Sequence, residues 1–299
     1  MKKLAITIML LSMAGLAAAD ELEDSYTKLK DAVAKKDADA VKADAATTNK
    51  LAMALVNAPK PADADEAKAW TERVQYGKEV STYTEYALAT TAAQVQVSEP
   101  AKAVALVDAL IAQNAKSKYL DELCANAYLV ALGKAGGPAK QAEGMAKIVA
   151  GRPDNIVALT ALSELRPASA GANASRLLAA AKKPKPEGLP DAEWEKMKNS
   201  ALANGYFYAG FTAGQKQAWK ECDSNLKSAL PLIAGDASKT ATAYFSLGIC
   251  NFNFGKLTND RTRMQAGQQY MEKAAAMKGP YQNQAYSQNL AMKQALGGR

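Results

Sequence analysis

The sequence predicts an all-α fold, an α-solenoid built from antiparallel helix hairpins. Apolar residues recur at steps of three and four along most of the 299-residue chain, which is the period of an amphipathic helix. No run of alternating β-branched residues is long enough to predict a strand. Glycine and proline gather in short breaks between the periodic segments, and breaks this short join antiparallel neighbours.

The first 19 residues have the pattern of a secretory signal peptide. Lys2 and Lys3 form a basic start, the run LAITIMLLSMAGL is apolar, and three alanines end at Ala19. The apolar run is short for a membrane helix of roughly 20 residues, so we expect cleavage after Ala19 and no integral membrane span in the mature chain. The predicted location is exported, either periplasmic or secreted.

The composition excludes the commonest catalytic and metal-binding arrangements. The chain has no histidine, which rules out Ser-His-Asp, Cys-His and HExxH sites. Its three cysteines, Cys124, Cys222 and Cys250, are far apart and form no CxxC motif. We therefore expect no metal, no cofactor and no enzyme activity. Carboxylate chemistry among the 30 Asp and Glu residues is the alternative left open.

The net charge and the ratio of lysine to arginine indicate which classes of partner the protein could bind. The net charge of +7 falls to about +5 without the two signal lysines, and the basic residues appear spread along the chain rather than gathered in one arm. They comprise 30 lysines against 7 arginines. Because bidentate contacts to phosphates and bases use arginine, we expect no nucleic-acid partner. An anionic lipid, a cell-wall polymer or an acidic partner stays open.

Residues 20–115 are predicted to form helical hairpins. Two short helices each carry an apolar stripe on one face. The stripe residues are Leu22, Tyr26, Leu29 and Val33, then Val41, Ala45, Thr48, Leu51 and Leu55. The segment NAPKPADAD breaks the pattern and offers polar caps for a long helix over 66–97. Tyr76 and Tyr83 share a face of that helix. A ligand platform is one interpretation, but core packing is favoured because aromatic residues at helical spacing usually pack.

More helices are predicted over 116–183. The stretch KYLDELCANAYLVALG is apolar on nearly all sides, which indicates a buried helix. The following GKAGGPAK lacks the spacing of a phosphate-binding loop and follows no strand, so we interpret it as a turn. Further helices are expected over 139–150, 155–166 and 172–183. The proline-rich KKPKPEGLP is a linker, with Asp191 placed to cap the next helix.

The stretch ATAYFSLGICNFNFG, residues 241–255, has the most specific spacing in the chain. Four residues share one helix face and the helix is expected to stop at Gly255. These four are Tyr244, Leu247, Gly248 and Phe252. Downstream, Gly267, Met271 and Ala274 form a matching stripe, which Gly279-Pro280 closes. Gly248 and Gly267 would let two paired helices approach closely where they cross.

This bulky, small, bulky spacing resembles the tetratricopeptide repeat, a helix-turn-helix unit with a proline near its end. The resemblance covers about residues 118–292, and an upstream copy makes Cys222 the small residue at the crossing. Two departures are Asn251, where the family has a large side chain, and an inter-helix turn longer by about seven residues than the usual period allows. The predicted divisions are 1–19, signal peptide; 20–115, helical hairpins; 116–183, repeats; 184–190, linker; and 191–299, C-terminal repeats with a capping helix.

The resemblance implies that first helices line a concave surface where a protein or peptide binds. Periodicity places six candidate residues towards that surface, and packing within or between repeats is the alternative for them. The six are Phe207, Phe211, Phe245, Ile249, Phe252 and Asn253. The leading hypothesis is a non-catalytic exported scaffold or adaptor with a protein or peptide partner in the cell envelope. The alternatives are a small-ligand or envelope-polymer binder that accompanies a transporter or cell-wall machinery, and a carboxylate enzyme such as a cell-wall hydrolase.

An oxidising compartment would permit a disulfide between Cys222 and Cys250, which lie on neighbouring predicted helices. Their predicted roles point the two side chains in different directions. We therefore expect small buried thiols rather than a bridge.

Overall fold

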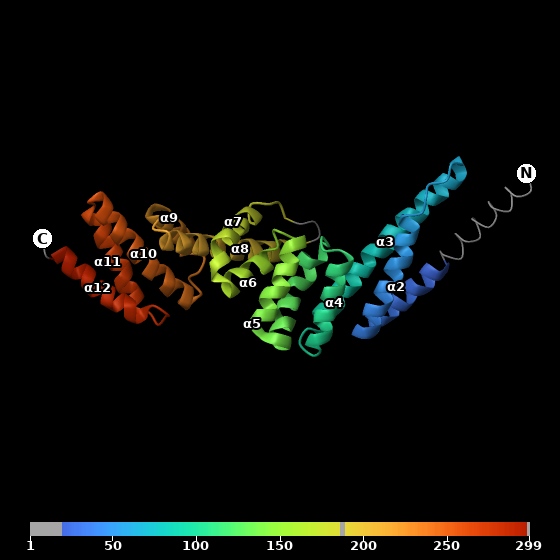
Figure 1. The fold of residues 1–299 in the computed structure, drawn as a ribbon, viewed down its shortest axis with the longest axis horizontal. Helices are drawn as coiled ribbons and strands as arrows, with labels where there is room; N and C mark the ends of the chain where they lie inside the picture. Colours follow the sequence, from blue (N-terminus) through green and yellow to red (C-terminus); the bar gives the residue numbers. More distant parts are fainter. Residues whose placement is uncertain (1–19, 186–188, 298–299) are drawn as a thin grey trace, which may run out of the picture. The chain divides into compact units, whose positions relative to one another are not determined.

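The computed structural model describes residues 20–185 and 189–297, so the predicted signal peptide lies outside the described residues. Every regular element in the described part is helical (Figure 1), as the sequence predicts. The chain divides into two compact units: the first ends at Arg152 and the second begins at Pro153. This division falls inside the predicted repeat segment 116–183.

The first unit is a series of helices in which each packs on the next. A helix over 20–35 is followed by α2 (Ala38–Val56), α3 (Ala64–Val95), α4 (Pro100–Gln113), the π-helical turn η1 (Leu120–Cys124) and α5 (Ala125–Gly151). Helix α3 packs against α2, α4 and η1. The core is built mainly from alanine and leucine, which lets the helices approach closely.

Side-chain caps set the starts of these helices. The Asp37 carboxylate accepts a hydrogen bond from the backbone N–H of Ala40, at 3.1 Å. The Asp63 carboxylate accepts from the N–H groups of Asp65 and Glu66, each at 3.0 Å. The prediction that NAPKPADAD caps the long helix is thus confirmed, with Asp63 as the cap.

The predicted turn after the buried helix is confirmed at Gly137, which breaks α5 into two halves. Gly137 has φ 71°, a left-handed conformation that side chains disfavour, and Pro138 follows it. The two halves fold onto one another, because a Cβ added at Gly144 would lie 2.9 Å from the Tyr128 ring. The amide of Gln141 also donates to the carbonyl of Leu129, at 2.9 Å.

The second unit contains α6 (Ile156–Leu165), the 3₁₀ turn η2 (Pro167–Ser169), α7 (Ala170–Ala180), α8 (Asp191–Gln215), α9 (Trp219–Ala229), α10 (Ala237–Thr258), α11 (Arg261–Ala276) and α12 (Gln282–Gly297). Helices α8 and α9 form one hairpin, and α10 and α11 form the next. Helix α10 also packs against α9 and α8, and α12 packs mainly on α11. The unit is therefore a stack of hairpins.

Two local predictions in this unit need correction. Asp191 does not cap α8: Pro190 is the capping residue and Asp191 is the first residue of the helix. Helix α10 does not stop at Gly255 but continues to Thr258. The capping residue after it is Asn259, whose φ of 53° is left-handed. Gly255 serves packing instead, because a Cβ there would lie 2.7 Å from the carbonyl oxygen of Asp260.

The predicted close crossing of α10 and α11 is confirmed. A Cβ on Gly267 would lie 2.5 Å from the backbone nitrogen of Phe252 and 2.9 Å from the carbonyl oxygen of Gly248. Asn251, the departure from the repeat pattern, is buried and donates to the Asp223 carboxylate, at 2.7 Å, and to the Leu247 carbonyl, at 3.0 Å. It therefore links the second hairpin to the first.

Cys222 and Cys250 form a disulfide, contrary to the expectation of two free thiols. Their Cα atoms are 6.3 Å apart, and both side chains are buried. The expectation failed because α9 packs not only on α8 but also on α10, which brings the two cysteines together. Gly214 of α8 makes room for the bridge, since a Cβ there would lie 3.3 Å from each sulfur.

Candidate functional site

Two of the six predicted binding residues lie in the core of the second unit. Phe207 is only 5% exposed and packs in the cluster shared by α8, α9 and α10. Phe252 is 8% exposed and packs with Met271 and Met292. Both rings are packing residues, which corrects the expectation that they line an open surface. Phenylalanine has no polar group to hold it at a wet boundary.

The other four predicted residues are half-buried but do not gather on one surface. Phe211 stacks on Phe207, with ring centroids 6.3 Å apart. Phe245 stacks on Tyr281 at 4.7 Å, and Ile249 packs beside it against the core of α10, α11 and α12. Asn253 is half-exposed on the same helix. Phe245 and Ile249 therefore pack between helices, whereas Phe211 contacts a ring of its own helix.

The first unit brings together four tyrosines from three separate segments, which we name the tyrosine row. Its members, in spatial order, are Tyr26, Tyr83, Tyr86 and Tyr119. Successive ring centroids lie 5.0, 5.9 and 5.7 Å apart. Tyr86 is 39% exposed and the other three are half-buried. The row is a continuous aromatic strip that reaches the protein surface.

Helix geometry places the first three rings. Tyr83 and Tyr86 are three residues apart on α3, so they are neighbours on its surface. Tyr26 lies on the helix over 20–35, which Leu22 and Leu29 anchor because both are fully buried. Sequence reasoning noticed Tyr83 but paired it with Tyr76, which packs, as Tyr26 does, against the core of Leu22 and Val80.

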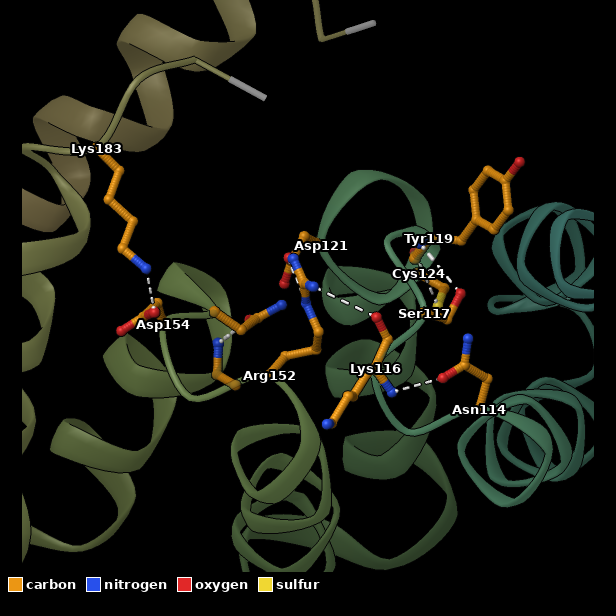
Figure 2. Close-up of polar contacts among 11 residues, drawn as sticks. Asn114, Lys116, Ser117, Tyr119, Asp121, Cys124, Arg152, Asp154 and Lys183 are labelled. Atoms are coloured by element: carbon orange, nitrogen blue, oxygen red, sulfur yellow. Dashed lines mark hydrogen bonds and ion pairs between the residues drawn. The ribbon is translucent and has the colours of Figure 1, made fainter. Parts of the chain in front are cut away.

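A hydrogen-bonded segment between α4 and η1 places the fourth ring, Tyr119 (Figure 2). The buried Ser117 hydroxyl accepts from the Tyr119 N–H, at 3.3 Å, and the Asn114 side chain accepts from the Lys116 N–H, at 3.0 Å. The amide group of Asn114 donates to the Glu85 carboxylate of α3, at 2.9 Å. This last bond ties the segment to the helix that carries Tyr86.

The π-helical turn η1 directly follows Tyr119 and holds its backbone in place. Such turns are frequent at functional sites. The Cys124 thiol donates to the Tyr119 carbonyl, at 3.4 Å. Arg152 pairs with Asp121 and donates to the Lys116 carbonyl, at 3.3 Å (Figure 2). Burial raises the pKa of the Cys124 thiol to about 12, so it stays a thiol at neutral pH and is not a nucleophile.

Charged groups lie at both ends of the row and beside it. The Lys30 ammonium lies 4.4 Å from the Tyr26 ring centroid, and the Lys118 ammonium lies 5.2 Å from that of Tyr119. Burial raises the pKa of Tyr119. The carboxylates of Glu122 and Glu85 raise it further, and the Lys118 ammonium opposes the shift. Burial also raises the pKa of Tyr83. These phenols therefore stay protonated at neutral pH and can donate hydrogen bonds.

The two units differ in net charge because their acidic residues are unevenly divided, whereas the basic residues are spread evenly, as expected. Residues 20–152 contain 17 Lys and Arg against 19 Asp and Glu, a net charge of −2. Residues 153–299 contain 18 against 11, a net charge of +7. The basic excess of the mature chain thus belongs to the second unit, and the tyrosine row lies in the acidic one.

Neither a metal site nor a membrane span appears in the part of the chain that the structure describes. No cluster of three or more Asp, Glu or Cys side chains there is arranged to hold a metal ion. None of the helices in residues 20–185 and 189–297 combines the length and the apolar character needed to cross a bilayer. Comparison of the chain with protein-family models, with curated proteins and with solved structures finds no match. The candidate site therefore rests on the geometry of the tyrosine row.

Proposed function

We propose that the protein is a non-catalytic exported scaffold or adaptor that binds a protein or peptide partner, and that the tyrosine row is its contact surface. The observation that carries this is the row itself: four rings from three segments, half-buried or exposed, on rigid supports. Tyrosine is enriched in the energetic centres of protein interfaces, because it offers a large apolar area and a hydroxyl at low cost in rotamer entropy.

The proposal includes a tetratricopeptide-like arrangement of the second unit. Two consecutive hairpins, α8–α9 and α10–α11, stack so that α10 contacts both helices of the preceding hairpin. Small residues lie at the crossing of the second hairpin, as that repeat requires. In this view the second unit is a packed scaffold and the first unit binds the partner.

Export is supported by the disulfide between Cys222 and Cys250, because such bonds persist in oxidising compartments and are rare in the cytosol. The amino-terminal pattern of residues 1–19 points the same way.

An alternative function is the binding of an anionic cell-envelope polymer. The observation that favours it is the net charge of +7 on residues 153–299, which would attract such a polymer. Its binding would fall steeply with added salt, whereas binding through the tyrosine row would depend much less on ionic strength.

The test is selection of peptide ligands from a displayed random library on the full mature chain, followed by affinity measurement on variants. The row variant is Tyr86→Ala with Tyr119→Ala. The matched control is Tyr286→Ala, which truncates a tyrosine on α12 that is 61% exposed. We expect the row variant to bind selected peptides roughly 30-fold more weakly, as for loss of a hot spot of about 2 kcal/mol.

Circular dichroism of each variant provides the folding control. Equal affinity of folded wild-type and row-variant protein would remove the tyrosine row from the proposal. A loss confined to Tyr286→Ala would instead move the binding surface to α12.

A further inference from the structure

The aromatic rings of this protein repeatedly carry a cation from the chain itself. Lys30 and Lys118 lie over the two end rings of the tyrosine row. In the second unit, the Arg263 guanidinium lies 4.4 Å from the Phe254 ring centroid, and the Lys273 ammonium lies 5.4 Å from that of Tyr244. Ring faces are negative in their quadrupole and attract such groups.

The two middle rings of the row differ from the end rings. Among the described residues, no lysine or arginine lies over Tyr83 or Tyr86. Tyr86 is also the most exposed member of the row, at 39%. The middle of the row therefore presents aromatic surface to a ligand, while the end rings are already occupied.

Two carboxylates lie beside the row: both Glu85 and Glu122 act on the phenol of Tyr119, the ring next to Tyr86. Glu85 precedes Tyr86 on α3 and is held by Asn114, and Glu122 lies one turn after Tyr119. Burial raises the pKa of Glu122, with Lys118 and Arg152 opposing the shift and Asp121 adding to it. The net charge of −2 on residues 20–152 adds a field of the same sign.

We propose that Tyr83 and Tyr86 receive a lysine or arginine side chain from an extended basic segment of the partner. This proposal rests on the proposed function, because it names the chemistry of the peptide that the row binds. In an extended peptide, side chains on one face repeat at about 6.6 Å, close to the ring spacing of the row.

The first experiment uses model peptides on the full mature chain labelled with ¹³C in its tyrosine rings. The probes are acetyl-Gly-X-Gly-amide with X as arginine, glutamine or glutamate. We expect the ring signals of Tyr83 and Tyr86 to shift with the arginine probe and to shift little with the other two. The signals of Tyr286 should stay in place, because that exposed ring lies in the basic unit.

Variants test the two parts of the proposed interaction. Tyr86→Leu should weaken arginine-probe binding roughly two- to fivefold, as expected for an exposed cation–ring contact, while Tyr86→Phe keeps the ring and the affinity. Glu122→Gln should weaken it by a similar factor. The matched control is Glu72→Gln, an exposed glutamate on α3 about 21 Å along the helix axis from Tyr86 and beyond the screening length.

Equal shifts with all three probes, or a stronger response to glutamate, would overturn the basic-segment proposal. Library peptides that bind through the row but lack lysine and arginine would overturn it and leave the proposed function standing. A third outcome combines two results: the row variants keep full affinity for library peptides, and the arginine probe still shifts the Tyr86 signal specifically. It would overturn both the proposed function and the proposed partner segment. The row would then be assigned as a cation site alone.

Discussion

The two units have the same number of tyrosines but differ in their phenylalanines. All five phenylalanines lie in the second unit, where Phe207 and Phe252 are core residues and Phe245 stacks between helices. The first unit has tyrosines and one tryptophan, Trp70, but no phenylalanine. Five of its six tyrosines are half-buried or exposed, because a phenol can pack its ring while its hydroxyl meets water. An aromatic pattern alone therefore does not separate a core from a binding surface, and neither does a hydroxyl, because Tyr128 and Tyr208 are both buried.

The units also differ in what holds them together. Both units have close approaches at glycine, but only the second has a covalent cross-link among its described residues, between α9 and α10. The first unit relies on an alanine-rich core and polar ties such as the Tyr128 hydroxyl, which donates to Asp108 at 2.7 Å. Changes in the second unit should thus act mainly on stability, and changes in the tyrosine row mainly on binding.

The sharpest test of this contrast truncates one aromatic residue in each unit. Phe252→Ala removes a buried ring that packs with Met271, and we expect a loss of about 3–5 kcal/mol. Tyr86→Ala removes a partly exposed ring that contacts Tyr83 and Tyr119, and should cost about 1–2 kcal/mol. Hydrogen–deuterium exchange, measured separately over each unit, gives the two values. If Tyr86→Ala caused a large loss of exchange protection in the first unit, the row would belong to the core.

The disulfide gives the second largest effect. Cys222→Ala with Cys250→Ala opens a loop with a sequence separation of 28, which corresponds to about 3–4 kcal/mol in the chain-entropy account. Exchange should rise over α9 and α10, and the first unit should keep its protection. Reductant should reproduce this in wild-type protein and do nothing further to the double variant. Cys124→Ala is the control, since that thiol has no disulfide partner.

The order of helices and their contacts with sequence neighbours were predictable. Breaks at glycine and proline marked the ends, and Gly248 with Gly267 marked a crossing, because both signals are local or span one hairpin. Helix ends were less certain. Gly255 was predicted to end α10, yet it permits a close contact with Asp260 and leaves the end to Asn259.

The disulfide and the tyrosine row were not predictable, for one shared reason. Each depends on the angle at which helices from different hairpins pack, and periodicity fixes only the face of a single helix. Tyr26 and Tyr119 meet the α3 tyrosines through tertiary packing alone. The spacing of Tyr83 and Tyr86 was the available local signal, since residues three apart on a helix are neighbours.

The glycine crossing gives the third effect. Gly267→Ala places a Cβ 2.5 Å from the backbone nitrogen of Phe252, so α10 and α11 must separate, at about 1–3 kcal/mol. Gly235→Ala is the matched control, because a Cβ there meets nothing within 4 Å. Thermal unfolding of both variants should show a clear drop for the first and almost none for the second. Equal unfolding temperatures would contradict the close crossing.

The smallest effect concerns the buried thiol of the first unit and depends on pH. Burial raises the pKa of Cys124 from its ordinary value of 9.0 to about 12, so the folded state holds the proton more tightly than the unfolded state. The contribution of this shift to the free energy of unfolding is fully present below pH 9 and is lost as the pH rises towards 12. Wild-type protein should therefore lose more stability between pH 8 and pH 10.5 than Cys124→Ala. Limited proteolysis in a urea series, with peptides from residues 20–152 quantified by mass spectrometry, measures this difference. The second unit has its two cysteines in a disulfide and should show no thiol contribution. An identical pH response of wild-type protein and Cys124→Ala would mean that the thiol is reached by water in the folded state.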